Sequence, residues 1–101
     1  MKTKTIKLKV TQLENKNQFL IKDNNFIYFQ SYDSLVAVYD KKNDIVILGC
    51  DWDYSKTTRK HLYIFLSEYC YFNDLYYKKN KKQYIYNCIK NKKIIYDKNM
   101  Q

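Results

Sequence analysis

The sequence predicts an α+β domain: an antiparallel sheet of three to four strands, one helix packed on a face of the sheet, and a second, basic helix at the C-terminus. Apolar residues alternate with a period of two through the first half of the chain, and from Ser55 the period becomes 3.6. Clusters of Asn and Asp, which favour turns, separate the segments in a chain with one glycine and no proline. Strands followed by helices predict one small domain over residues 1–101.

Short strands are expected in the first half of the chain. Residues 5–10 place Ile6, Leu8 and Val10 on one face of a half-buried strand, and residues 13–16 are ambiguous. Further apolar runs predict strands at 18–21, 26–32 and 35–39. The polar stretch 40–44 between two β-rich runs predicts a hairpin loop.

Residues 45–52 give the clearest strand signal. The run from Ile45 to Leu48 consists of four consecutive apolar residues, which predicts burial on both faces. We therefore expect this strand to be central in the sheet.

Two helices are expected after residue 55. Thr58, His61 or Leu62, Phe65 and Tyr69 fall on one stripe of a helix that Asp53 or Ser55 could cap. A second, lysine-coated helix is expected over residues 75–92, and residues 98–101 are expected to fray.

The positive charge is concentrated near the C-terminus. The net charge is +9, and residues 78–101 hold eight lysines against Asp97. The first 77 residues hold eleven basic and nine acidic residues. This basic, Lys/Tyr-rich region, residues 74–101, would attract polyanions or acidic protein surfaces. A second interpretation stays open: eighteen lysines to one arginine suits an AT-rich genome, whereas selection for phosphate contacts would favour arginine.

Tyrosine is the other excess, with twelve in the chain, several of them interleaved with lysine in the C-terminal region. Such side chains anchor protein interfaces or stack on bases, although some of them would simply cap the core with their hydroxyls in water. The residues predicted to bind a partner are Tyr76, Tyr77, Lys78, Lys79, Lys81, Lys82, Tyr84, Tyr86, Lys92 and Lys93.

The sequence gives little support to catalysis. A general base needs a positioned carboxylate and a nucleophile, which no spacing supplies for His61, the one histidine. Asp51 and Asp53 lack a third acid for a metal site. The cysteines at 50, 70 and 88 match no zinc pattern and are expected to be buried or half-buried thiols. We expect no catalytic residue, no metal and no cofactor.

The location expected for the chain is the bacterial cytoplasm. No run approaches the ~20 apolar residues of a membrane span. The first residues, Met1 to Lys4, lack the apolar stretch of a signal peptide.

Two segments carry a resemblance to other proteins: residues 31–37, SYDSLVA, and residues 51–65, DWDYSKTTRKHLYIF. Over residues 26–72 the chain resembles small uncharacterised proteins from phages and integrated mobile elements of low-GC Firmicutes. Small proteins of such elements are often inhibitors of host defence, such as anti-CRISPR proteins. The resemblance carries over no catalytic residue.

The resemblance therefore implies a stoichiometric inhibitor that binds a host protein or ribonucleoprotein complex by occupying a protein or nucleic-acid-binding surface. The alternative is a small basic nucleic-acid-binding accessory protein. A homodimer built through an exposed strand edge also stays open.

Overall fold

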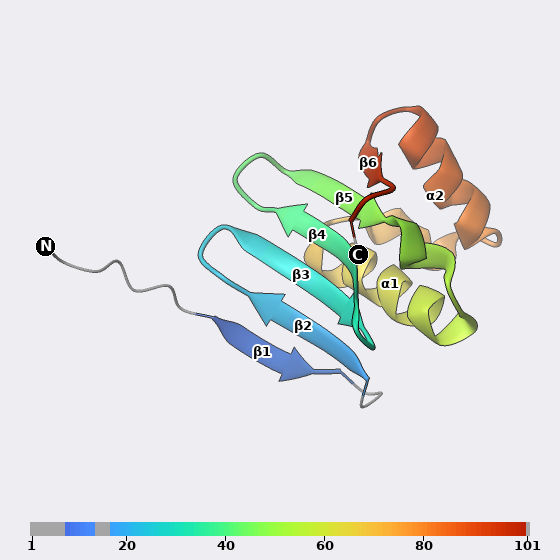
Figure 1. The fold of residues 1–101 in the computed structure, drawn as a ribbon. Coiled ribbons are helices and arrows are strands. Elements are labelled where there is room, and N and C mark those ends of the chain that lie inside the picture. The colour runs from blue at the N-terminus through green and yellow to red at the C-terminus, as the bar shows by residue number, and fades with distance from the viewer. Residues whose placement is uncertain (1–7, 14–16, 101) are drawn as a thin grey trace, which may run out of the picture.

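The fold is a six-stranded sheet with its helices on one face (Figure 1). A computed structural model describes residues 8–13 and 17–100. In chain order the elements are β1 (Lys9–Gln12), β2 (Gln18–Lys22), β3 (Phe26–Ser31), β4 (Ser34–Asp40), β5 (Ile45–Gly49), the 3₁₀ helix η1 (Cys50–Asp53), α1 (Lys56–Tyr69), the 3₁₀ helix η2 (Asn73–Tyr77), α2 (Lys81–Lys90) and β6 (Ile94–Asp97).

The sheet is larger than predicted and it is mixed. Its strands lie in the order β1-β2-β3-β4-β5-β6, with antiparallel pairing from β1 to β5 and parallel pairing between β5 and β6. The expectation of three to four antiparallel strands is therefore wrong, although the domain is α+β. The helices carry the chain back across the sheet, so that β6 joins β5 in the same direction.

The core lies between the sheet and the helices. Helix α1 packs on β3 and β4, behind the sheet in Figure 1, and α2 lies beside β6. The rings of Phe29 and Phe65 stack across this interface with their centroids 5.8 Å apart. Leu20, Leu48 and Ile85 extend the same core to β2, β5 and α2.

The first helix matches its sequence signal. Ser55 caps α1, because its Oγ accepts a hydrogen bond of 3.1 Å from the backbone N–H of Thr58. Thr58, His61, Leu62 and Phe65 are buried against the sheet. The residues that carry the 3.6 period therefore form the packing face of the helix.

Residues 75–92 do not form the one helix that was expected. The 3₁₀ helix η2 and helix α2 are separate, with residues 78–80 between them. Asn80 starts the second helix, because its side chain accepts a hydrogen bond of 3.0 Å from the backbone N–H of Gln83. The helical periodicity of the sequence runs on through this region, but the cap at Asn80 starts a separate helix.

The strand expected over residues 45–52 ends at Gly49, and Trp52 lies in η1, 4% exposed. The indole ring meets the ring of Tyr86 edge-on, with the centroids 5.3 Å apart. The strand lies inside the sheet, but Ile45 and Ile47 are only half-buried. Its expected burial on both faces is therefore wrong.

The turns rely on Asp and on left-handed backbone. The carboxylate of Asp23 accepts hydrogen bonds from two backbone N–H groups of the β2–β3 turn. The expected hairpin loop at 40–44 is confirmed, and Asp44 there has a φ of 54°. Three bulkier residues also take positive φ values: Tyr32 (54°), Tyr71 (66°) and Lys92 (61°).

Gly49 serves a close approach of two chain segments. A Cβ at this position would lie 2.6 Å from the carbonyl oxygen of Met100 and 3.0 Å from that of Leu35. Only a residue without a side chain lets the C-terminal segment lie this near the sheet.

Some predictions fall outside the described residues. These are the predictions for residues 5–7 of the first expected strand, for residues 14–16 and for residue 101.

Candidate binding surfaces

The predicted partner-binding residues lie on η2, on α2 and in the turns that follow each of them. We call the exposed side chains of residues 76–93 the basic C-terminal surface. Its most exposed aromatic residue is Tyr77, at 88%, and Tyr76 and Tyr86 are 53% and 47% exposed. Lys78, Lys79, Lys82, Lys92 and Lys93 are exposed as well.

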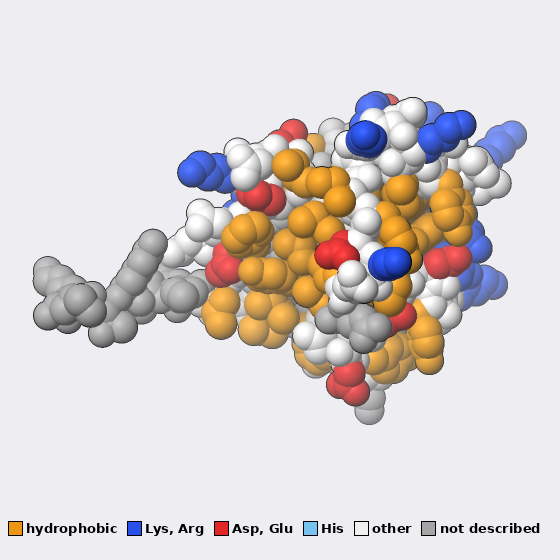
Figure 2. All heavy atoms as spheres, turned by 45° about the horizontal axis from the view of Figure 1, so that its top comes forward, with side chains coloured by type: hydrophobic (Ala, Val, Ile, Leu, Met, Phe, Trp, Pro, Cys, Tyr) orange, Lys and Arg blue, Asp and Glu red, His pale blue; other side chains and the backbone are white. Residues whose placement is uncertain are grey.

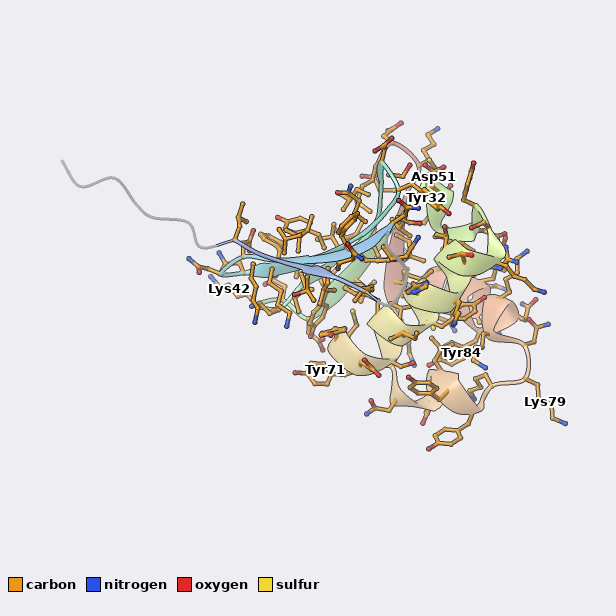
Figure 3. All side chains as sticks on the ribbon, turned by 90° about the horizontal axis from the view of Figure 1, so that it is seen from below. Tyr32, Lys42, Asp51, Tyr71, Lys79 and Tyr84 are labelled. Atoms are coloured by element: carbon orange, nitrogen blue, oxygen red, sulfur yellow. The ribbon has the colours of Figure 1, made fainter. Side chains whose placement is uncertain are left out.

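Two predicted residues are less available than the sequence suggested. Tyr84 is half-buried against the core, and the Lys78 Nζ lies 5.4 Å from the centre of its ring. Lys81 is half-buried and its Nζ donates a 3.0 Å hydrogen bond to the carbonyl oxygen of Lys78. In Figure 3 Lys79 extends away from the body, whereas Tyr84 lies beside the helices.

Lys82 belongs to an ion-pair cluster around Asp53. Its Nζ lies 3.0 Å from one carboxylate oxygen of Asp53, and Nη1 of Arg59 lies 2.8 Å from the other. Burial raises the pKa of Asp53, but hydrogen bonds from Lys82 and Arg59 and their positive charges outweigh it, and the pKa lies below its usual range. The cluster ties α2 to the start of α1.

The other lysines of this surface are not neutralised. Within residues 8–13 and 17–100, Lys82 is the one lysine with a carboxylate oxygen within 4.0 Å. Lys79, Lys90, Lys92 and Lys93 are exposed. Their charge is therefore available to an outside partner, which sequence alone could not establish.

A cleft lies where the two resemblance-carrying segments meet. It encloses about 580 Å³, and Tyr32 and Asp51 lie side by side at its edge in Figure 3. On its inner wall the Ser31 and Thr58 hydroxyl oxygens are 2.9 Å apart. The start of α1 would attract an anion, but Asp33 and Asp51 line the cleft and none of its described lining residues is a lysine or arginine. Phosphate groups are therefore better suited to the basic C-terminal surface.

The residues with reactive side chains are mostly buried. His61 is 4% exposed, and its Nδ1 lies 2.9 Å from the carbonyl oxygen of Thr57. Cys70 and Cys88 are buried and Cys50 is half-buried, and none of them forms a disulfide, which confirms the expected thiols. In the described part of the chain no three His, Cys, Asp or Glu residues could hold a metal ion together.

The face of the sheet opposite the helices carries a row of apolar side chains, and we call it the open face. Val10, Ile21, Tyr28, Val38, Ile47 and Ile95 form a register row that crosses all six strands. Figure 2 shows hydrophobic side chains gathered over the sheet, with most lysines towards the margin of the view. The alternation in the sequence predicted strands, but only the strand order aligns these residues into one surface.

Among the described residues no helix is long and apolar enough to cross a membrane.

Comparison with known proteins places the chain in a family. No curated protein and no solved structure matches the chain. Residues 1–86 match the model of a family of unknown function, DUF8033, which reaches from the N-terminus into α2. Because this match takes in most of the chain, the protein belongs to the DUF8033 family.

Proposed function

We propose that the protein is a non-enzymatic binding protein that attaches, through the basic C-terminal surface, to an acidic surface of a host protein or ribonucleoprotein complex. The observation that carries this proposal is a group of exposed lysines on the basic C-terminal surface, which also exposes Tyr77. Among the described residues these lysines have no ion-pair partner: Lys79, Lys90, Lys92 and Lys93. In the setting that the sequence resemblance suggests, such binding would inhibit a host-defence complex stoichiometrically.

The physical basis is electrostatic attraction with aromatic anchoring. Unpaired lysines raise the rate of encounter with an acidic surface and lose that effect as salt screens them. Exposed tyrosines contribute contact area at small entropic cost, and they are enriched at interfaces. The surface is formed by a helix and two turns, which suits the occupation of another molecule's surface.

The test compares two charge-matched variants in capture from a nuclease-treated lysate of a low-GC Firmicute, followed by titration of the captured complex. One variant replaces Lys79, Lys90, Lys92 and Lys93 by Gln, which spares the contacts of Lys78, Lys81 and Lys82. The control replaces four exposed lysines elsewhere by Gln: Lys41, Lys42, Lys56 and Lys60.

We expect a one-to-one complex that the first variant loses and the control keeps. Equal capture by both variants would overturn the proposal, because net charge alone would then explain the binding. Expression of the wild-type protein in a strain that restricts a phage should also raise the efficiency of plaquing, and the first variant should not raise it.

Binding of single-stranded nucleic acid is a second candidate, favoured by the exposure of Tyr77 next to Lys78 and Lys79. Fluorescence anisotropy with a labelled oligonucleotide should then show affinity that falls steeply from about 50 to about 200 mM salt. Tyr77→Ala should weaken this binding more than Tyr54→Ala does. Tyr54 serves as the control because it follows η1, outside the basic C-terminal surface, and is 75% exposed. No binding at low salt would exclude this candidate.

A further inference from the structure

The open face is mostly apolar, and the polar residues that share it by register include Gln12, Gln30 and Asp40. An antiparallel sheet with one face in water usually alternates apolar and polar residues. Here Ile27, Phe29, Val46 and Leu48 point into the helix-covered core, and most of their neighbours on the open face, such as Tyr28 and Ile47, are apolar too. In the register row, Val10 is 60% exposed and Ile95 is 46% exposed.

The centre of this face is already partly shielded from water. Val38 is 7% exposed, yet it does not belong to the core between sheet and helices. It lies between Tyr28 on β3 and Ile47 on β5 in the register row. Phe26 and Tyr28 extend the apolar surface along β3, with ring centroids 6.0 Å apart.

The few polar groups near this face are satisfied within the chain. The hydroxyl of Tyr28 donates to the carboxylate of Asp23 at 3.1 Å. The carboxylate of Asp40 accepts hydrogen bonds from its own turn, including one of 2.8 Å from the Asn43 side chain. A second layer laid on the sheet would therefore leave these groups paired, and it would avoid the cost of an orphaned polar group.

Most of the positive charge of the molecule lies elsewhere. Lys9 and Lys22 project to the helix side, since Lys22 lies over the Tyr69 ring at 5.0 Å and pairs with Lys9 across β1 and β2. The register row contains no charged residue, and the basic C-terminal surface belongs to η2 and α2. Two copies could therefore meet through this face despite a net charge of +9 each.

We propose that the open face is the interface of a homodimer, in which the sheets of two copies pack face to face. Interfaces between identical chains are more apolar and poorer in charge than those with transient foreign partners. The row of apolar residues runs from edge strand to edge strand, which fits a layer of equal size: a second copy of the same sheet. Packed sheets would lie about 10 Å apart.

The size of the face sets the strength of this dimer. Six strands about 4.8 Å apart and about 17 Å long span roughly 400 Å² per copy. Side chains stand up from the sheet and add surface to this flat projection, so the total area buried by two copies comes near the ~1,000 Å² at which specific interfaces begin. We therefore expect a reversible dimer rather than an obligate one, whose interface would be larger.

The experiment is sedimentation equilibrium of the full chain over a range of concentrations. The weight-average mass should rise from 12.4 kDa towards twice that value. Added salt should strengthen the dimer, because it screens repulsion between two positive copies. Binding to an anionic partner through lysines should weaken with salt, so the dimer and the proposed function are tested separately.

Two neighbouring substitutions on β1 give a matched comparison. Val10→Lys places a charge on the open face, and Thr11→Lys places the same charge on the other face, as successive residues of a strand point in opposite directions. Val10→Lys should weaken dimerisation at least tenfold, and Thr11→Lys should leave it near the wild-type value. Ile21→Lys, deeper in the row, should abolish the dimer while circular dichroism reports a folded chain.

Three results would overturn the proposal. The wild-type chain could stay at 12.4 kDa up to the highest concentration measured. The two β1 variants could weaken association equally, which would indicate an edge contact or general charge repulsion. A monomer whose open face is covered only by a foreign protein would likewise show that the second layer is not another copy.

Discussion

The hydroxyl oxygens of Ser31 and Thr58 lie 2.9 Å apart in the buried layer between sheet and helix, although 27 residues separate them in the chain. The Thr58 hydroxyl also accepts a 3.1 Å hydrogen bond from the cap residue Ser55. The cap of α1 and the end of β3 are thus joined by one short chain of hydroxyl groups, which fixes where the helix starts against the sheet.

This relationship predicts an energetic coupling between β3 and α1. Thr58→Val keeps the shape and removes the shared hydroxyl, and Ser31→Ala removes the partner. Each should lower the free energy of unfolding by about 1–3 kcal/mol, because a buried hydrogen-bonding group is left without its partner. A double-mutant cycle in urea should give a coupling of about 1 kcal/mol. Strict additivity of the two changes would show that the contact does not form.

The glycine at the end of β5 predicts a second effect on stability. Gly49→Ala should destabilise the fold by about 1–3 kcal/mol, because its Cβ would overlap the Met100 carbonyl oxygen, 2.6 Å away. Thermal unfolding measures this cost. In a chain shortened by residues 100–101 the same substitution should cost less, since Leu35 then remains as the near contact, at 3.0 Å. An equal cost in both chains would count against the close approach.

The ion pairs of Asp53 predict a pH dependence. Its pKa is lowered in the folded protein, so the carboxylate binds a proton less readily than in the unfolded chain. The resulting stability is present above the unfolded pKa of about 4 and is lost as pH falls through the folded value. The Asp53 side chain is 26% exposed, so Asp53→Asn should cost less than about 1 kcal/mol at neutral pH.

Unfolding in denaturant between about pH 7 and about pH 3 measures this effect. The difference between wild type and Asp53→Asn should shrink towards the acid end, as protonation begins to remove the charge of Asp53 and with it the two ion pairs. Asp74→Asn, at an exposed acid of η2, is the control for loss of one negative charge. A difference that stays constant over the whole pH range would contradict the role of the Asp53 ion pairs.

Thiol labelling should distinguish the three cysteines. Burial raises the pKa of Cys70, and burial is also the main cause of the raised pKa of Cys88. Because the thiolate is the reactive form, both should react slowly in the folded protein, and the half-buried Cys50 should react first. Alkylation followed by peptide mass spectrometry gives the order, and early labelling of Cys70 would show that α1 opens locally.

Local signals were sufficient to predict much of this fold. Ser55 as a cap, the stripe from Thr58 to Phe65 and the hairpin loop at 40–44 are decided by neighbours in the chain. In contrast, β6 was missed because Ile95 also fits the helical spacing of the residues before it, and only pairing with β5 makes this segment a strand. The sheet was therefore underestimated where its contacts are distant in sequence.

The candidate surface was predicted in composition but not in detail. The lysine and tyrosine content of residues 76–93 located the basic region. The sequence could not show that Lys82 pairs with Asp53, which precedes it by 29 positions, or that Tyr84 turns towards the core. The open face depended even more on the fold, since its row combines one residue from each of six strands.

The left-handed turns determine where the sequence can still change. Tyr32, Tyr71 and Lys92 hold positive φ values that cost a residue with a side chain about 1–2 kcal/mol relative to glycine. Lys92 lies between α2 and β6, and its side chain is exposed on the basic C-terminal surface. A glycine there would relieve backbone strain, but it would also remove one of the exposed lysines of that surface. At this turn backbone strain and positive charge are therefore opposed, because the residue that would relax the backbone carries no charge.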